Sequence, residues 1–256
     1  MNQDQKVFFH KLGDAQKADR LVYERPDEPK WGFGTEVSKD GELLLIYIWR
    51  STEEKNLLFT QDLTKADATP KAIVDTWIGS FGLVAKEGTK LWLQTNFEAE
   101  KGRLIQVDLA DTDKSNWKEI VPEAASTLLS AKRVGDRLIM SFLEDAQAKV
   151  ETYSLEGESR GKLKLPGVGS VRGFDGEPGN PETFFSYTSF TTPQAIYRYN
   201  VDTGAISLFK EPKVDFDPNE YETTQVFYPS KDGTKIPMFI THKKGIKLDS
   251  SHRVLL

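Results

Sequence analysis

Short apolar runs separated by turns recur along almost the whole chain. Each run is rich in Val, Ile, Leu, Phe, Tyr, Trp and Thr and is bounded by Gly, Asp, Asn or Pro, which is typical of β-strands. Apolar residues at helical spacing are missing from nearly the whole sequence, and this absence argues against repeats built from pairs of helices. The pattern predicts an all-β protein.

A strand-like segment that ends in Leu or Val repeats at a nearly constant interval. The last residues of these segments are Leu12, Leu63, Leu109, Leu155 and Val201. Leu12 and Leu63 lie 51 positions apart, and each later interval is 46 positions. A second marker, a turn glycine before an apolar strand, recurs every 47 residues at Gly41, Gly88 and Gly135. Glycine permits the positive φ of a tight hairpin turn. Two markers in phase indicate an internal repeat.

Each repeat contains four strand-like runs, for example 81–85, 90–96, 104–109 and 117–121. Four strands in about 40 to 50 residues are typical of a β-propeller blade. Four complete units span 31–212, and 7–26 reads as the outer half of another. Propeller blades bury their faces by closing a ring. Four and a half antiparallel blades do not close a ring, so their number predicts that this chain is part of a longer propeller.

The repeat pattern ends at Pro212. The acidic, proline-interrupted stretch 213–222 suits a linker. Two apolar runs then flank Asp232-Gly233, which is a strong hairpin signal. We therefore predict a partial propeller over 1–212, a linker over 213–222, and the first hairpin of a different domain within 223–256.

Charge and composition narrow the classes of partner. The chain has 34 Lys and Arg against 39 Asp and Glu, a net charge of −5, which argues against nucleic-acid binding. Its longest apolar run, 43–48, is far shorter than the roughly 20 residues of a membrane helix. The first six residues lack the basic and apolar regions of a secretory leader. We expect no nucleic-acid or membrane partner.

Several segments resemble the prolyl oligopeptidase family. Tyr187-Thr-Ser-Phe-Thr-Thr-Pro-Gln-Ala-Ile-Tyr197 and the block from Tyr221 to Asp249 are similar to its junction between propeller and hydrolase domain. The segments 25–31 and 37–41 are similar to its mid-propeller. The resemblance implies a seven-bladed propeller that caps an α/β-hydrolase domain, in a monomeric serine endopeptidase that cleaves short peptides after proline without a cofactor. It implies a cytoplasmic protein, or a periplasmic one if a leader lies upstream.

The chemistry of such a peptidase is not found in this sequence. The fold requires a serine within Gly-x-Ser-x-Gly, and the nearest string, 167–173, has the wrong spacing. The three histidines, His10, His242 and His252, lack metal-ligand spacing, and we expect each to be structural. We therefore predict no catalytic residue and no metal site here, and no hydrolysis by this chain alone.

The resemblance also implies contacts to the peptide from the propeller. When the outer peptide subsites of the family are transferred to this sequence position by position, the resemblance places them at Gly32, Trp49 and Thr52. Relatives carry larger or differently charged residues there, and packing of Trp49 against the next blade is an equal alternative. The five tryptophans otherwise suit core or inter-blade packing.

Two other functions remain open. A stand-alone β-propeller could serve as a scaffold for protein interactions, with the hairpin as an accessory. A five-bladed glycosidase would need several acidic residues at the central axis, and the strands around 34–37 and 81–86 do not supply a convincing set.

Overall fold

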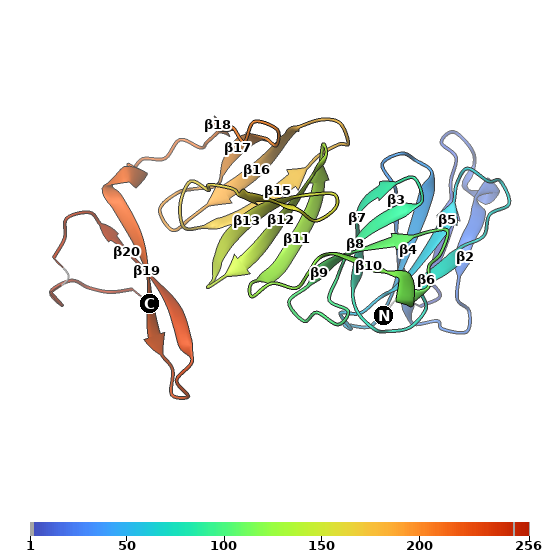
Figure 1. The fold of residues 1–256 in the computed structure, drawn as a ribbon, viewed down its shortest axis with the longest axis horizontal. Helices are drawn as coiled ribbons and strands as arrows, with labels where there is room; N and C mark the ends of the chain where they lie inside the picture. Colours follow the sequence, from blue (N-terminus) through green and yellow to red (C-terminus); the bar gives the residue numbers. More distant parts are fainter. Residues whose placement is uncertain (1–2, 248, 256) are drawn as a thin grey trace. The chain divides into compact units, whose positions relative to one another are not determined.

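The computed structural model describes residues 3–247 and 249–255. Met1, Asn2, Leu248 and Leu256, which fall within the ranges predicted above, lie outside the described residues. The described part contains twenty β-strands, all pairings being antiparallel where a register is given, and three short 3-10 helices (Figure 1). The all-β prediction is confirmed.

Four sheets of four strands each follow one another along the chain, and each is built from strands consecutive in sequence. The first sheet consists of β3 (Trp31–Val37), β4 (Leu43–Arg50), β5 (Leu57–Asp62) and β6 (Lys71–Val74). The second sheet consists of β7 (Phe81–Glu87), β8 (Lys90–Thr95), β9 (Arg103–Asp108) and β10 (Lys118–Val121), with the helix η2 (Lys114–Asn116) before β10.

The third and fourth sheets repeat this arrangement. The third consists of β11 (Thr127–Val134), β12 (Arg137–Glu144), β13 (Gln147–Ser154) and β14 (Ser159–Lys162). The fourth consists of β15 (Ser170–Asp175), β16 (Glu182–Thr188), β17 (Ala195–Asn200) and β18 (Ile206–Lys210). The predicted four complete blades are therefore present.

A two-stranded sheet precedes the first blade, as the half repeat predicts. It pairs β1 (Lys6–Phe9) with β2 (Arg20–Glu24), and the helix η1 (Gln16–Ala18) lies between them. His10, which the repeat placed on a surface strand, is exposed but follows the last residue of β1.

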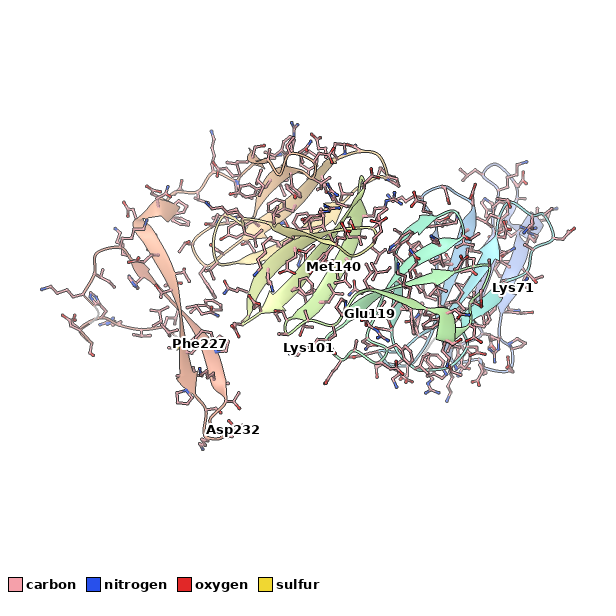
Figure 2. All side chains as sticks on the ribbon, in the orientation of Figure 1. Lys71, Lys101, Glu119, Met140, Phe227 and Asp232 are labelled. Atoms are coloured by element: carbon pink, nitrogen blue, oxygen red, sulfur yellow. The ribbon has the colours of Figure 1, made fainter. Side chains whose placement is uncertain are left out.

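The predicted hairpin after the fourth sheet is also present. It consists of β19 (Tyr221–Pro229) and β20 (Lys235–Lys243), preceded by the helix η3 (Pro218–Glu220). Gly233 in its turn has φ +85°, and Asp232 accepts hydrogen bonds from Ser230 and Thr234. Phe227 on β19 is exposed (Figure 2). Pairing extends to Tyr221 opposite Lys243, so the strand begins two residues inside the expected linker; the domain ranges themselves stay a prediction.

The turn glycines have the conformation that their spacing predicts. Gly41, Gly88 and Gly135 have φ values of +76°, +57° and +54°. Each precedes the second strand of its sheet. Residues with a Cβ rarely adopt this left-handed region, so the repeated glycines fix the repeated turns.

The chain divides into two compact units, Met1–Ala131 and Lys132–Leu256, and the boundary falls within β11. In the first unit, β4 is buried on both faces. Leu45 packs in a cluster with residues of the second sheet, whereas Ile46 and Ile48 pack with the β1–β2 pair. In the second unit, Ile139 and Phe185 share one cluster between the third and fourth sheets.

Side-chain amides join neighbouring sheets in the first unit. The Gln5 carboxamide accepts a hydrogen bond from Phe33 N (2.8 Å) and donates to Phe33 O (3.2 Å). The Asn56 carboxamide does the same at Phe81, with distances of 2.7 and 3.3 Å. Each amide therefore satisfies both polar main-chain groups of one residue on the first strand of the next sheet.

Candidate functional site

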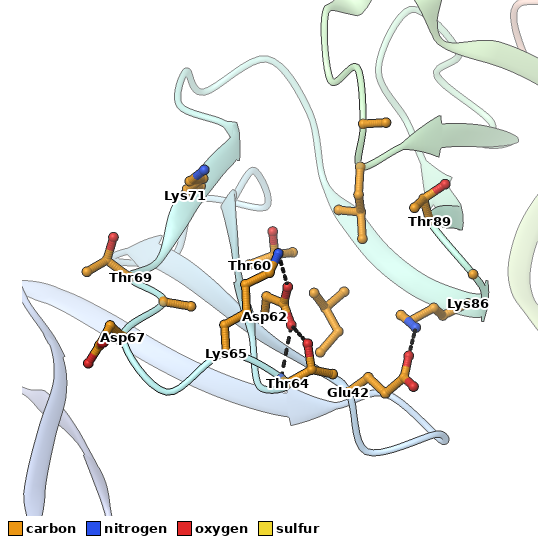
Figure 3. A pocket seen from close by; sticks show the side chains of 15 residues that line it. Glu42, Thr60, Asp62, Thr64, Lys65, Asp67, Thr69, Lys71, Lys86 and Thr89 are labelled. Carbon is orange, nitrogen blue, oxygen red and sulfur yellow. Dashed lines mark hydrogen bonds and ion pairs between the residues drawn. The ribbon is translucent and has the colours of Figure 1, made fainter.

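Two hollows lie at the opposite ends of β4. The first, about 610 Å³, lies between the first two sheets near Leu43 (Figure 3). The second, about 520 Å³, lies at the Arg50 end. An eight-residue strand separates its ends by roughly 23 Å at about 3.3 Å per residue. The two hollows are therefore separate candidates for a functional site.

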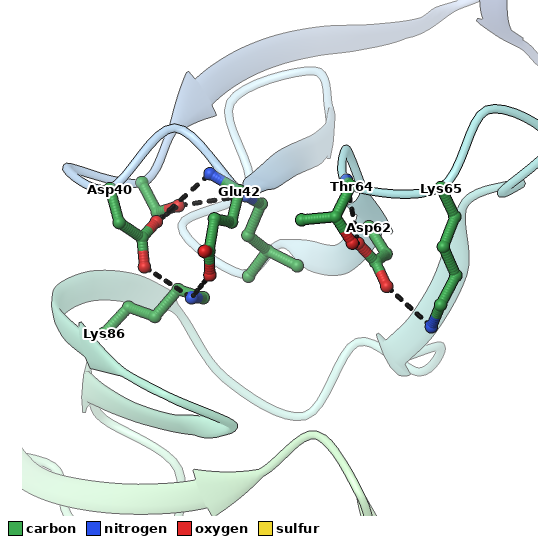
Figure 4. Close-up of polar contacts among 8 residues, drawn as sticks. Asp40, Glu42, Asp62, Thr64, Lys65 and Lys86 are labelled. Atoms are coloured by element: carbon green, nitrogen blue, oxygen red, sulfur yellow. Dashed lines mark hydrogen bonds and ion pairs between the residues drawn. The ribbon is translucent and has the colours of Figure 1, made fainter.

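Several charged side chains at the first hollow form ion pairs (Figure 4). The Lys86 amine on β7 lies 2.5 Å from Asp40 and 3.0 Å from Glu42, both in the first sheet's β3–β4 connection, and its side chain is 6 % exposed. Asp62 contacts Lys65 at 2.8 Å and accepts a hydrogen bond from Thr64. The Lys86 pairs join the first two sheets, and the Asp62 pair holds the β5–β6 loop to the end of β5. Both roles are structural.

The Lys86 pair perturbs the protonation of both partners. Burial alone would raise the pKa of Asp40, but hydrogen bonds from Lys86 and Ser38 outweigh it and lower that pKa from 3.8 to about 2. Burial alone would lower the pKa of the Lys86 amine, whereas hydrogen bonds to Asp40 and Glu42 raise it above its ordinary value. Both shifts favour the charged pair in the folded state.

Acid is expected to weaken this junction between the first and second sheets. Between pH 4 and pH 2 the unfolded chain binds a proton at Asp40 that the folded chain excludes, so the free energy of unfolding falls as the pH falls. Lys86→Met should reduce this pH dependence, because Asp40 then loses the partner that lowers its pKa. Urea denaturation at a series of pH values measures it.

Asp40→Asn should reduce the pH dependence of the free energy of unfolding over the same range, since it removes this titrating group. The double variant should reduce it no further than Asp40→Asn does. An unchanged pH dependence in both single variants would contradict the assignment.

The second hollow is flanked by a stack of arginine and tryptophan side chains. The Arg25 guanidinium lies 4.5 Å from the ring centre of Trp31, and Arg50 lies 4.5 Å from that of Trp77. The two indoles meet edge to face with centroids 5.3 Å apart. Cation–π contact and edge-to-face packing both stabilise such a stack. Its members come from the segment before β3, the first residue of β3, the end of β4 and the β6–β7 loop.

Carboxylates neutralise both ends of this stack. Asp27 accepts two hydrogen bonds from Arg25, at 2.8 and 2.7 Å, which raise the pKa of that guanidinium further above its usual range. Glu53 accepts a hydrogen bond from Arg50 Nε at 2.5 Å, and this bond lowers the pKa of Glu53. The carboxylates thus hold the arginines in place over the indoles.

The predicted site residues lie at this same end of the first sheet. Trp49 pairs with Gly32 across β3 and β4, and a Cβ at Gly32 would lie 2.4 Å from Trp49 Cε2 and Nε1. Gly34 lies under the same ring. Trp49 remains 39 % exposed. The glycines therefore let the indole lie flat across β3 while one side of the ring faces solvent.

Gly32→Ala is expected to displace Trp49. Overpacking of this kind costs about 1–3 kcal/mol, and the ring would move because the backbone of β3 is fixed by its pairing to β4. Tryptophan fluorescence and thermal unfolding report the change. Gly82→Ala on β7 is the matched control, because an added Cβ there meets nothing within 4 Å. Equal responses of the two variants would contradict the packing argument.

Thr52, the third predicted residue, lines the second hollow together with Trp31 and Arg50. The structure thus gathers all three predicted residues at one end of the sheet, with Gly32 and Trp49 in direct contact. Sequence reasoning did not single out the roles of Arg25, Arg50 and Trp77. Trp77 stands far from Trp31 in sequence, and no local pattern indicates their contact. The assignment of the three residues to peptide binding stays a prediction.

The histidines do not assemble a catalytic group in the described part of the chain. His10 Nδ1 lies 2.6 Å from Asp19 Oδ1 at an exposed position. His242 Nδ1 lies 3.0 Å from the Lys243 carbonyl and 3.7 Å from Glu222. Neither ring has a serine hydroxyl as a hydrogen-bond partner among residues 3–247 and 249–255. A triad needs that contact.

The described residues hold no group of three or more His, Cys, Asp or Glu arranged to bind a metal ion. No helix among them is long and apolar enough to span a membrane.

Comparison with known proteins decides the family. Residues 1–212 match the family described as prolyl oligopeptidase, N-terminal beta-propeller domain. The chain belongs to this family. It is 34 % identical to the prolyl endopeptidase of Elizabethkingia meningoseptica over 257 residues, which cover 100 % of this chain and 36 % of that protein. The prolyl endopeptidase of Dictyostelium discoideum is also 34 % identical, over 98 % of this chain and 35 % of the relative.

Solved structures agree with the sequence match. A prolyl endopeptidase structure superposes with a TM-score of 0.87 at 33 % identity, covering 96 % of this chain and 36 % of that chain. Prolyl oligopeptidase B from Galerina marginata, solved with a 35-residue substrate, gives 0.85 at 28 % identity over 96 % of this chain and 35 % of that one. The chain spans about a third of the length of these prolyl oligopeptidases. The match confirms the predicted propeller and favours the peptidase interpretation over a stand-alone scaffold.

Proposed function

We propose that this chain supplies the propeller portion of a prolyl oligopeptidase, which admits short proline-containing peptides to a serine peptidase domain. The observation that carries the proposal is the family match over residues 1–212. The hairpin β19–β20 supports it, because the segment from Tyr221 to Asp249 resembles the family's junction with its hydrolase domain. In this proposal the chain contributes substrate selection, and the nucleophile belongs to the peptidase domain.

Within this function, the exposed side of Trp49 and the hydroxyl of Thr52 face the bound peptide. An indole gives an apolar contact surface with few rotatable bonds, and Thr52 offers one hydroxyl donor and acceptor. Gly32 acts by leaving room for the Trp49 ring. The Arg50 end of the first sheet therefore selects the residues of the peptide that lie away from the scissile bond.

The remaining partner and location assignments follow from charge and resemblance. The net charge of −5 disfavours a nucleic-acid partner. We propose a monomer that works in the cytoplasm, without a membrane partner or a cofactor.

A chimera tests the proposed function. The aligned region of the Elizabethkingia meningoseptica prolyl endopeptidase is replaced by this chain, and hydrolysis of a Gly-Pro-linked chromogenic amide is measured. We expect the chimera to hydrolyse the amide and the 256-residue chain alone to be inactive. A folded but inactive chimera, or turnover by the chain alone that a serine-directed phosphonate abolishes, would contradict the proposal.

Trp49→Ala in the chimera tests the site. Loss of an outer contact should raise KM for a longer peptide more than KM for the short chromogenic amide, with kcat little changed. Trp117→Ala is not a suitable comparison, because Trp117 packs against Phe81 and Phe97 in the core. Thr69→Ala in the other hollow is the control and should leave both KM values unchanged.

A further inference from the structure

The first hollow, between the first two sheets, has the size and the lining of a small-molecule site. Its volume of about 610 Å³ lies within the roughly 300–1,000 Å³ that such sites usually span. Its apolar lining includes Leu43, which is 4 % exposed, and Leu109, which packs against the core cluster that the two sheets share. All of its lining residues belong to one compact unit of the chain.

Thr60, on β5, turns its side chain into this hollow. It pairs with Leu45 on β4, and antiparallel partners lie on the same face of a sheet. Leu45 packs in the cluster shared with the second sheet. Thr60 therefore also faces the second sheet, where it lines the hollow and is 7 % exposed.

The Thr60 hydroxyl makes no hydrogen bond within residues 3–247 and 249–255. Thr152 holds the same position of the repeat in the third sheet, two 46-residue intervals later, and its hydroxyl donates to Gly161 O at 3.3 Å. A buried hydroxyl normally has such a partner. Thr60 thus presents an unused donor and acceptor to the hollow.

Lys71, the first residue of β6, stands beside Thr60. The two residues pair in the β5–β6 register, so their side chains share one face, with Cβ atoms about 4.5–5.5 Å apart. Figure 3 shows both on the first-sheet side of the hollow, across from Lys86 and Thr89. The Lys71 amine has no ion-pair partner in the described part of the chain. An ammonium and a hydroxyl side by side are donors suited to one carboxylate.

The other charges of the lining favour a ligand with a single negative charge. Three carboxylates and three amines line the hollow: Glu42, Asp62, Asp67, Lys65, Lys71 and Lys86. Lys65 and Lys86 already contact carboxylates, so Lys71 is the amine left for a ligand among the described lining residues. The second charge of a phosphate would be repelled by the exposed carboxylate of Asp67.

We propose that this hollow binds a short peptide through its free C-terminal carboxylate, held between Lys71 Nζ and Thr60 Oγ1, with the apolar side chain of the last residue against Leu43 and Leu109. For the source of the peptide the inference rests on the proposed function, because hydrolysis after proline releases a peptide that ends in a compact apolar ring and a carboxylate. The hollow lies at the opposite end of β4 from Trp49, so it is separate from the proposed substrate contacts.

Titration of the 256-residue chain with the dipeptide Gly-Pro, followed by amide NMR, tests the site. We expect saturable shifts at Thr60, Lys71 and Thr89, with a Kd of about 1 mM. Gly-Pro amide, which lacks the carboxylate, and inorganic phosphate should each bind at least about fivefold more weakly. Added salt should weaken the binding of Gly-Pro, because Lys71 is exposed.

Three results of this titration would overturn the proposal. They are the absence of saturable shifts at about 20 mM Gly-Pro, equal affinity for the amide or for phosphate, and shifts confined to the Trp49 end of β4.

Substitutions assign the contacts. Lys71→Met should weaken Gly-Pro binding about fivefold or more, and Thr60→Val about threefold. Thr60→Val removes no hydrogen bond within the described residues and keeps the shape of the side chain, so the thermal midpoint should stay unchanged. Lys118→Met is the matched control, because Lys118 is the first residue of β10, as Lys71 is of β6, but does not line the hollow. Equal affinity in all three variants would contradict the assignment.

The outcomes for this site and for the proposed function are distinguishable. An active chimera, together with a chain whose hollow does not bind Gly-Pro, overturns the inference and leaves the proposed function standing. An inactive chimera, together with carboxylate-dependent binding that Lys71→Met weakens, supports the site and counts against the function.

Discussion

Phe185→Ala is expected to lower the free energy of unfolding by about 3–5 kcal/mol, the usual cost of truncating a buried phenylalanine. The side chain is 1 % exposed and stacks on Phe174 and Tyr197 with ring centroids 4.8 and 5.4 Å away. Truncation therefore removes two ring contacts and leaves a cavity between the third and fourth sheets. Urea denaturation followed by circular dichroism measures the loss.

Phe184→Ala is the matched control on the next residue of β16. Its ring lies on the opposite, uncovered face of the strand, so the same truncation should cost about 1 kcal/mol or less in this chain. Similar losses for Phe184 and Phe185 would contradict the assignment of the two faces.

Asn56→Ala is expected to cost about 2 kcal/mol, the second-largest effect. The substitution leaves the N–H and C=O of Phe81 without partners at a partly buried junction, and an unsatisfied group costs about 1–3 kcal/mol. Hydrogen exchange should also become faster in β7, the strand that the amide holds. Urea denaturation and exchange measured on the same protein test both expectations.

Gln194→Ala is the control for Asn56→Ala within the same chain. Asn56 and Gln194 each lie seven residues before the last residue of a repeated segment, Leu63 and Val201. Gln194 is exposed, so its removal should change stability by less than about 0.5 kcal/mol. A large loss at Gln194, or none at Asn56, would show that the amide position does not stabilise the junction between sheets.

The sequence predicts the repeated units because their signals are local. A turn glycine such as Gly88 is recognised from its residue type, because glycine readily adopts a positive φ. An apolar run such as Leu43–Arg50 is recognised as a strand from adjacent residues alone. The 46-residue interval then counts the sheets without any knowledge of their packing. The segments that resemble the prolyl oligopeptidase family are likewise continuous in sequence, so the family could be predicted from the sequence.

The site was only partly predictable, because its contacts join residues distant in the chain. Packing of strands and loops brings Trp31 against Trp77 edge to face. It also places the Trp49 ring over Gly32. Sequence placed Gly32, Trp49 and Thr52 near one another by analogy, but it gave no reason for the glycine. The close approach of the indole to β3 supplies that reason.

Local backbone preference and the spacing of apolar residues thus determined, from sequence alone, that this protein is a series of four-stranded antiparallel sheets. Tertiary structure decided which face of each sheet is covered and which amides are satisfied. Gln194 and Asn56 hold the same repeat position, yet only Asn56 meets a neighbouring strand. The physical reason is that hydrogen bonding and burial depend on the neighbour in space, and a sequence repeat specifies only the neighbour along the chain.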